Sequence, residues 1–335
     1  MAVVTPARPC RGDYLPEDGA GLIKRGTMEH TQQRLLRRGL LRRGLTAKQY
    51  EIFFGILFAA PVVLHLLVFK YYPVLYSIRL SLFRGTLLNP FREYFGIENY
   101  LFILRNEYAL RGYLNTLVFA AMYVPASLVL ALSLGMLVSR KRFGNTFFRA
   151  AFYTPVVVSI VAAVQVWSWL LNPEPYGLFN TVLNSIGLPQ LQWLHHPNTS
   201  LMSIALMGLW NSGFGMLIFL AAITSIPNEL YESAKVDGAG GWIQFWRITL
   251  PMLMPTIYFV VITSTIFSLK LFEPVLLLTG GGPLSSTTTV AYQIYEQAFM
   301  FSRWGRASAQ ATIFFVLVLV ITVIQYKYLP ESYEK

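Results

Sequence analysis

The segment ELYESAKVDGAGGWIQFWRITLP, residues 229–251, interrupts a chain that is otherwise strongly apolar. Long hydrophobic segments lie on both sides of it, whereas the segment itself carries two glutamates, a lysine, an aspartate and three closely spaced glycines. An aromatic run follows the glycines and ends at Pro251. This pattern indicates a short charged helix that stops on glycine, emerges from a membrane and contacts another protein.

The composition is that of a membrane protein. Of 335 residues, 55% are hydrophobic and 13% are charged, whereas soluble domains carry roughly 25% charged residues. The net charge of +11 raises the question of nucleic acid binding. The basic residues, however, follow a membrane topology, and we expect no nucleic acid partner. The single cysteine, Cys10, excludes an intramolecular disulfide framework.

Six segments are long and apolar enough to cross a hydrocarbon core of about 30 Å, which takes roughly 20 helical residues. Because lipid offers backbone groups no outside hydrogen-bond partner, and no barrel-type alternation appears, all six are predicted to be helices. The predicted spans are residues 52–69, 115–138, 150–171, 201–226, 257–278 and 307–326. The predicted fold class is therefore an all-α, polytopic membrane helical bundle.

The distribution of lysine and arginine predicts the orientation. With the N-terminus inside, 18 of the 27 basic residues face one side and seven face the other, while Lys70 and Lys270 lie at or inside spans. The positive-inside rule then places both termini in the cytoplasm. The predicted regions are a basic cytoplasmic segment at 1–51, a transmembrane domain at 52–328 with the charged loop at about 227–255, and a short tail at 329–335.

The basic N-terminal segment contains LLRRG twice in tandem, at 35–39 and 40–44. As a helix it would form a basic amphipathic piece that lies on an anionic inner leaflet. Gly39 and Gly44 disfavour a helix, however. A solvated tail that sets the topology is the alternative interpretation, and the apolar run from Ile52 is longer than that of a typical signal peptide.

The charged loop resembles the EAA loop of ABC importer permeases, whose pattern is E-A-A, three residues, G, nine residues and I-x-L-P. The chain has Glu232-Ser233-Ala234, then Gly238, then ITLP at 248–251. Ser233 departs from the pattern but is small enough to fit. The flanks of the loop and LTGGGP at 278–283 resemble the carbohydrate-importer branch with maltose-type permeases, and the similarity extends over 52–325.

This resemblance implies a type I importer permease in a bacterial cell membrane, with the EAA helix seated in a groove of a cytoplasmic ATPase. The chain would form half of a translocation pathway beside a second permease subunit, with two copies of the ATPase and an extracytoplasmic substrate-binding protein. ATP-driven closure of the ATPase dimer would move the helix and rock the permease pair. The resemblance assigns ATPase coupling to Glu232, Ser233, Ala234, Asp237 and Gly238.

Nucleotide chemistry is expected in the partner. The chain has no G-x-x-x-x-G-K-[ST], and none of its eight lysines follows a glycine. It therefore lacks the loop that cradles phosphates in P-loop proteins. We expect a transport subunit that is not an enzyme and has no cofactor of its own, with ATP and magnesium bound by the separate ATPase.

Polar residues inside the predicted spans are candidates for the substrate path, because charge at that depth costs about 2.5–3.5 kcal/mol on insertion scales. Lys270 and Glu273 are three residues apart in the predicted fifth span, so an intrahelical ion pair is as well supported as a functional role. Asn211 can donate to and accept from sugar hydroxyls. Trp210 offers an apolar platform or simple packing, and Gln165 in the third span leaves the same choice open.

We expect a polyol or an oligosaccharide as the substrate. Because Lys270 departs from the uncharged polar residue common in the resembling family, a phosphorylated polyol such as glycerol phosphate is the alternative. Gly280, Gly281, Gly282 and Pro283 are expected to bend an outer loop toward the docked binding protein. A secondary transporter would show inverted repeats, which are not evident, and a membrane scaffold leaves the polar residues unexplained.

Overall fold

The computed structural model describes residues 47–139, 144–174 and 176–328. The predicted basic segment 1–51 is therefore described only from residue 47 onward, and the LLRRG repeats and the predicted tail at 329–335 lie outside the described residues. The chain divides into two compact units, Met1–Pro73 and Val74–Lys335. The functional features that follow all belong to the second unit.

The first described helical run corresponds to the first predicted span. It comprises α2 (Ala47–Leu66), a π-helical stretch η1 (Leu67–Tyr71) and α3 (Tyr72–Leu80), which reaches into the second unit. The run from Tyr50 to Leu80 is long and apolar enough to cross a membrane, and none of its most apolar window is buried within the chain. This span is longer than the predicted one because helix continues past Phe69.

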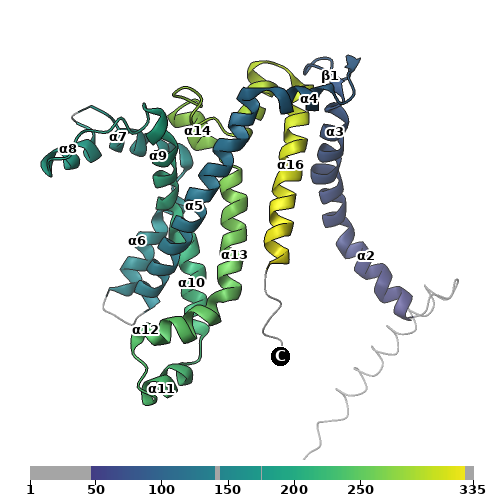
Figure 1. The fold of residues 1–335 in the computed structure, drawn as a ribbon. Coiled ribbons are helices and arrows are strands. Elements are labelled where there is room, and N and C mark those ends of the chain that lie inside the picture. Colours follow the sequence, from purple (N-terminus) through teal and green to yellow (C-terminus); the bar gives the residue numbers. More distant parts are fainter. Residues whose placement is uncertain (1–46, 140–143, 175, 329–335) are drawn as a thin grey trace, which may run out of the picture. The chain divides into compact units, whose positions relative to one another are not determined.

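The second unit opens with an antiparallel pair of short strands, β1 (Phe83–Arg84) and β2 (Glu93–Tyr94), and a short helix, α4 (Glu98–Arg105). Next comes α5 (Glu107–Ser139), the longest helix described. It packs against α9 (Pro197–Leu209), α10 (Gly213–Ser225) and α13 (Leu250–Leu269), as Figure 1 shows. Clusters of buried apolar side chains along these contacts form the core.

Glycines allow α10 to approach its neighbours closely. A Cβ at Gly213 would lie 2.2 Å from the backbone oxygen of Phe152 in α6 (Asn145–Val157), and one at Gly215 would lie 2.8 Å from the Cβ of Ala131 in α5. Such positions admit no larger side chain unless the helices separate. Small residues near Asn211 thus serve tight helix packing at these two glycines.

The predicted third span is not one straight helix. Residues 150–171 fall on α6 and α7 (Ile160–Leu170), which are bent by 102° at the break between them. Pro155 lies in the last turn of α6, where it has no N–H to donate and weakens the helix. The chain becomes extended at Val158, directly after the last residue of α6, and α7 begins two residues later.

The fourth span is α9 and α10 joined by a 3₁₀ turn, η2 (Trp210–Ser212), and a short helix α8 (Leu178–Ser185) precedes it. After α11 (Asn228–Val236), α12 (Gly241–Gln244) and a π-helical stretch η3 (Phe245–Thr249) continue directly into α13. The helical run of the fifth span thus extends from Gly241 to Leu269 and begins before the predicted residue 257. Pro251, which has no N–H to donate, is accommodated just after the π-helical stretch.

The predicted fifth span also ends too late. Helix α13 stops at Leu269, and a separate short helix α14 (Glu273–Leu278) follows after three residues. The cause is Pro274, which cannot donate to the carbonyl of Lys270 and therefore fits the first turn of a new helix but not the interior of α13. The carbonyl of Leu271 instead accepts a hydrogen bond of 2.7 Å from the Thr289 hydroxyl.

The described chain ends with α15 (Val290–Tyr295), a π-helical stretch η4 (Glu296–Met300) and α16 (Trp304–Lys327). Five helical runs are long and apolar enough to cross a membrane, and the bent pair α6–α7 makes a sixth if it counts as one span. The prediction of a helical membrane bundle is confirmed. The orientation of its ends stays a prediction.

Candidate functional site

The charged loop folds as predicted around a helix that ends on Gly238. Helix α11 ends with a Schellman motif: the N–H of Ala239 donates to the carbonyl of Ala234 at 2.8 Å, and that of Gly238 to Lys235 at 3.0 Å. Gly238 has φ of +78° and no atom within 4 Å of where a Cβ would lie. Glycine is required here by backbone conformation and not by packing.

Helix α11 is anchored to the bundle by Tyr231. The Tyr231 ring packs against the cluster that contains Ile226 and Leu253, at the end of α10 and the start of α13. Its hydroxyl lies 2.9 Å from the hydroxyl of Thr249, which is buried. Tyr231 therefore links α11 to both α10 and α13.

The outer surface of α11 is free to contact a partner. Glu232, Ser233 and Asp237 are exposed, and Ala234 is half-buried. The hydroxyl of Ser233 donates to the carbonyl of Glu229 one turn earlier at 2.8 Å, so this serine adds little bulk to the helix surface. No ion pair engages Glu232 or Asp237 within the part of the chain that the structure describes.

A cavity of about 410 Å³ lies among α5, α6, η2, α10 and α13. Its lining combines aromatic rings, aliphatic side chains, hydroxyls and one carboxamide, and none of its residues is charged. Two of the helices that line it, α10 and α13, are the helices that hold Tyr231. The lining residues are Tyr123, Ser127, Ala131, Val156, Asn211, Ser212, Phe214, Gly215, Ile218, Val260, Thr263, Ser264 and Phe267.

Asn211 supplies the carboxamide of this cavity from the 3₁₀ turn between α9 and α10. Among the described residues, no hydrogen-bond partner engages its side chain, so both its donor and its acceptor are available to a ligand. The neighbouring Ser212 hydroxyl is occupied, because it donates to the carbonyl of Leu209 at 2.6 Å. Asn211 is thus the strongest polar candidate in the bundle.

The other predicted substrate-path residues do not line this cavity. Trp210 packs edge-on against Trp167 with ring centroids 6.2 Å apart, and Gln165 is exposed on α7. Lys270 and Glu273 are exposed on either side of the break between α13 and α14. The intrahelical ion pair is wrong, because the two residues lie on different helices and no salt bridge joins them in the described structure.

Sequence reasoning missed the lining residues that come from remote parts of the chain, on α5 and α13. Tyr123 and Ser127 belong to α5, whereas Thr263, Ser264 and Phe267 belong to α13. Hydroxyls inside spans give a weak signal, because they are often satisfied locally, as at Thr263, whose hydroxyl donates to the carbonyl of Phe259 at 2.8 Å. The polar run T-S-T at 263–265 was the signal available.

The glycine-rich loop lies at the opposite end of the second unit from α11 (Figure 1). Gly280 and Gly281 have φ of +56° and +83°, and a Cβ at Gly281 would lie 2.8 Å from Thr288 and from Tyr292. Asn115 of α5 donates to the carbonyls of Ser285 and Thr288, at 2.9 Å each. Leu284 is left 79% exposed at the tip, next to Pro283.

A buried polar network supports this same end. The hydroxyl of Tyr108 donates to the Glu296 carboxylate, and Gln310 donates to Gln293 at 2.6 Å. Burial raises the pKa of Glu296 above its ordinary value, and the hydrogen bond from Tyr108 opposes that rise in part. This network joins α5, α16 and the segment from α15 to η4.

A bundle of helices that are long and apolar enough to cross a membrane defines the class as a polytopic membrane protein. The chain belongs to the binding-protein-dependent transport system inner membrane component family, whose model matches residues 105–334.

Three comparisons illustrate the similarity. The trehalose/maltose transport system permease protein MalF of Thermococcus litoralis is 31% identical over 281 residues, covering 84% of this chain and 95% of that protein. The sn-glycerol-3-phosphate transport system permease protein UgpA of Yersinia enterocolitica is 30% identical over 253 residues, covering 73% of this chain and 84% of that protein. A crystal structure of a bacterial alginate ABC transporter, in complex with alginate pentasaccharide-bound periplasmic protein, aligns with a TM-score of 0.72 and 26% identity. The alignment covers 83% of this chain and 93% of the matched chain in that structure.

Proposed function

We propose that this chain forms half of the translocation pathway of an ATP-driven importer and couples to a separate ATPase through α11. The observation that carries this proposal is the anchoring of α11 to α10 and α13, which also line the cavity that contains Asn211. Movement imposed on the exposed surface of α11 would thus reach the cavity wall through packed side chains. The residues that contact the ATPase are Glu232, Ser233, Ala234, Asp237 and Gly238.

The proposed assembly contains a second homologous permease, two copies of a cytoplasmic ATPase and an extracytoplasmic substrate-binding protein in a bacterial cell membrane. The periplasmic protein in the alginate transporter complex supports the binding-protein partner. In this assembly both termini face the cytoplasm with α11, and the loop with Gly280, Gly281, Gly282 and Pro283 faces the binding protein. ATP and magnesium are bound by the ATPase.

The proposed substrate is a neutral carbohydrate, either an oligosaccharide or a polyol. The cavity offers hydroxyls, the Asn211 carboxamide and aromatic rings, and no side chain of opposite charge for a phosphate. A desolvated anion without a partner is costly, so an uncharged lining favours a hydroxyl-rich ligand. The relative named for trehalose and maltose transport agrees with this choice.

A phosphorylated polyol is the second candidate, and one observation favours it. Lys270 is exposed directly after the last turn of α13, three residues beyond Phe267 of the cavity lining. An ammonium at this position attracts anions, and one relative is named for glycerol-phosphate transport. Glu273 lies on the other side of the break and lowers the net charge there.

Uptake of matched neutral and phosphorylated solutes by the assembled complex decides between the candidates. Asn211→Leu should lower uptake of either solute, because a hydroxyl-rich ligand loses a donor and an acceptor. Lys270→Gln should leave uptake of the neutral solute unchanged if the substrate is a neutral carbohydrate. The second candidate would be established if the wild type takes up the phosphorylated solute in preference to the neutral one and Lys270→Gln loses that preference.

Trp210→Phe is the control for Asn211→Leu, since Trp210 lies next to Asn211 but outside the cavity lining. This control should retain uptake while the Asn211 variant loses it. Normal uptake by Asn211→Leu in a correctly assembled complex would remove the cavity from the substrate path.

A further inference from the structure

Arginine side chains gather where the β1–β2 hairpin, α4 and the first turn of α16 meet. Two cavities of about 240 and 360 Å³ flank this point, and Arg84 and Arg306 line both of them. Arg92 and Arg303 also line the smaller cavity, and Arg105 lines the larger one. These five residues are called the arginine cluster.

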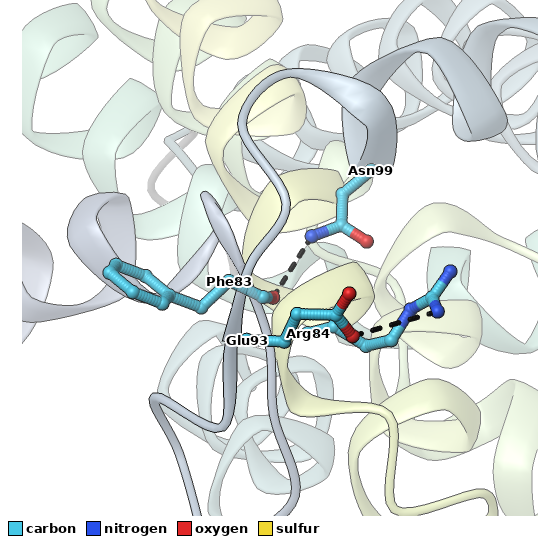
Figure 2. Close-up of polar contacts among 4 residues, drawn as sticks. All are labelled: Phe83, Arg84, Glu93 and Asn99. Carbon is cyan, nitrogen blue, oxygen red and sulfur yellow. Dashed lines mark hydrogen bonds and ion pairs between the residues drawn. The ribbon is translucent and has the colours of Figure 1, made fainter.

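Packing of the backbone brings the cluster together. A Cβ at Gly305 would lie 1.9 Å from the carbonyl oxygen of Phe83, so the start of α16 rests directly on β1. Asn99 of α4 is buried and donates to the carbonyls of Ser81 and Phe83 at 2.8 and 3.0 Å. Figure 2 shows the Asn99 amide directed at the Phe83 carbonyl, with Arg84 and Glu93 extending together away from the Phe83 ring.

The positive charge of the cluster is poorly compensated. Within the described residues its single ion pair joins Arg84 Nη1 to Glu93 Oε2 at 3.8 Å, and both side chains are more than half exposed. An exposed pair at this distance contributes little. Glu98 lines the larger cavity, and Glu296 lines a neighbouring cavity together with Arg303 and Arg306. Five guanidinium groups thus face three carboxylates, a surplus that attracts anions.

Aromatic rings hold three guanidinium groups of the cluster in place; one is Arg303, whose Cζ lies 5.4 Å from the centre of the Phe301 ring. Arg84 Cζ lies 4.0 Å from the centre of the Phe95 ring, and Arg306 Cζ lies 3.9 Å from that of Phe102. Stacking occupies the face of a guanidinium and leaves the N–H groups in its plane available. A planar fork of donors fits the oxygens of a phosphate.

The cluster lies where a span meets the membrane surface. Trp304 begins the apolar run that continues to Lys327, which places Arg303 and Arg306 at its first turn. Exposed aromatic and aliphatic side chains surround this point, and the positive end of the α16 dipole adds to the attraction for anions. These apolar neighbours are Phe299, Phe301 and Leu104, which are 65%, 52% and 55% exposed.

We propose that the arginine cluster binds the phosphate of an anionic phospholipid at the membrane surface. The guanidinium groups hold the headgroup, and the apolar side chains beside them accept the acyl chains. A free phosphate shares the headgroup chemistry but gains nothing from those apolar neighbours. The site is separate from the translocation path, because no residue of the arginine cluster lines the cavity that contains Asn211.

The test measures lipid retention by the full-length chain in its assembled complex, using native mass spectrometry. The probes are phosphatidylglycerol and phosphatidylcholine with identical acyl chains, and inorganic phosphate as a separate arm. The wild type should retain phosphatidylglycerol in preference to phosphatidylcholine. Replacing Arg303 and Arg306 with Gln should weaken phosphatidylglycerol binding about fivefold for each arginine removed, with phosphatidylcholine binding unchanged.

Arg79→Gln is the matched control, because Arg79 stacks on Phe91 at 4.8 Å but lines neither cavity. Arg306→Lys keeps the charge without the planar fork and should give intermediate affinity, which separates binding from a folding defect. Equal retention of the two lipids, or retention unchanged by the double variant, would overturn the proposal. Binding of inorganic phosphate as tight as that of phosphatidylglycerol would reassign the site to a free anion. Unchanged lipid binding with lost binding-protein association would assign the cluster to a protein interface.

Discussion

Replacing Gly238 with alanine tests whether the end of α11 is set by backbone conformation. The added Cβ meets no atom within 4 Å, so the change has no packing cost. The residue must nevertheless keep φ near +78°, which costs an L-residue about 1–2 kcal/mol. Since about 1.4 kcal/mol corresponds to a factor of ten in an equilibrium constant, the equilibrium constant for forming the capped end of α11 should fall about tenfold.

Two assays measure this loss. Hydrogen exchange at the amide of Ala239, which donates to Ala234 at 2.8 Å, should speed up about tenfold, because this bond depends on the left-handed residue before it. ATPase activity of the reconstituted complex should respond less to the binding protein, with membrane insertion unchanged. Gly238→Val, with a β-branched side chain, should cost more than Gly238→Ala.

Gly240 provides a matched control. It also has no atom within 4 Å of its Cβ position, but its φ is −67°. Gly240→Ala should therefore leave exchange and coupling near wild type, and Gly238→Asn should recover part of the loss because asparagine tolerates the left-handed conformation. Equal effects of Gly238→Ala and Gly240→Ala would refute the conformational argument.

Three further predictions concern other parts of the second unit. Burial raises the pKa of Glu296 above its ordinary value of 4.5. The stability contributed by its neutral form is therefore complete below pH 4.5 and is lost as pH rises through the raised pKa. Glu296→Gln should remove this decline in thermal melts of the purified chain, and a pH dependence that the variant leaves unchanged would contradict the prediction. Gly213→Ala should destabilise the folded chain by about 1–3 kcal/mol, because its Cβ would meet Phe152 at 2.2 Å. Gly55→Ala places a Cβ in open space and should not destabilise the fold. Equal melting temperatures of the two variants would argue against close packing at Gly213. A photo-crosslinker at the exposed tip residue Leu284 should capture the binding protein, and capture of the ATPase instead would reverse the topology.

The sequence allowed the helical bundle to be predicted because apolar length is a local property. The end of α11 was equally predictable, since Gly238 and the charged turn before it are contiguous. Asn211 was identified because a lone carboxamide inside a span has few local partners. The rest of the cavity depends on tertiary packing that places Tyr123 beside residues of α13, and no local pattern encodes that meeting.

The errors at the fifth span have a different origin. Hydropathy continues across residues 269–273, so apolar length alone predicts an unbroken helix. Pro274 is the local signal that ends α13, and a prediction from apolar length alone does not take this proline into account. The same error led to the prediction of an ion pair between Lys270 and Glu273, because their spacing places them on one helical face only when the helix is continuous.

The three residues between α13 and α14 act as a joint. Helix α13 packs against α5 and α10, whereas α14 packs against α7 and joins the apolar cluster of α5 and α9. The bond from Thr289 to the carbonyl of Leu271 fixes the position of the joint without fixing the direction of either helix. The joint therefore separates the helix that lines the cavity from the short helix that leads into the glycine-rich loop.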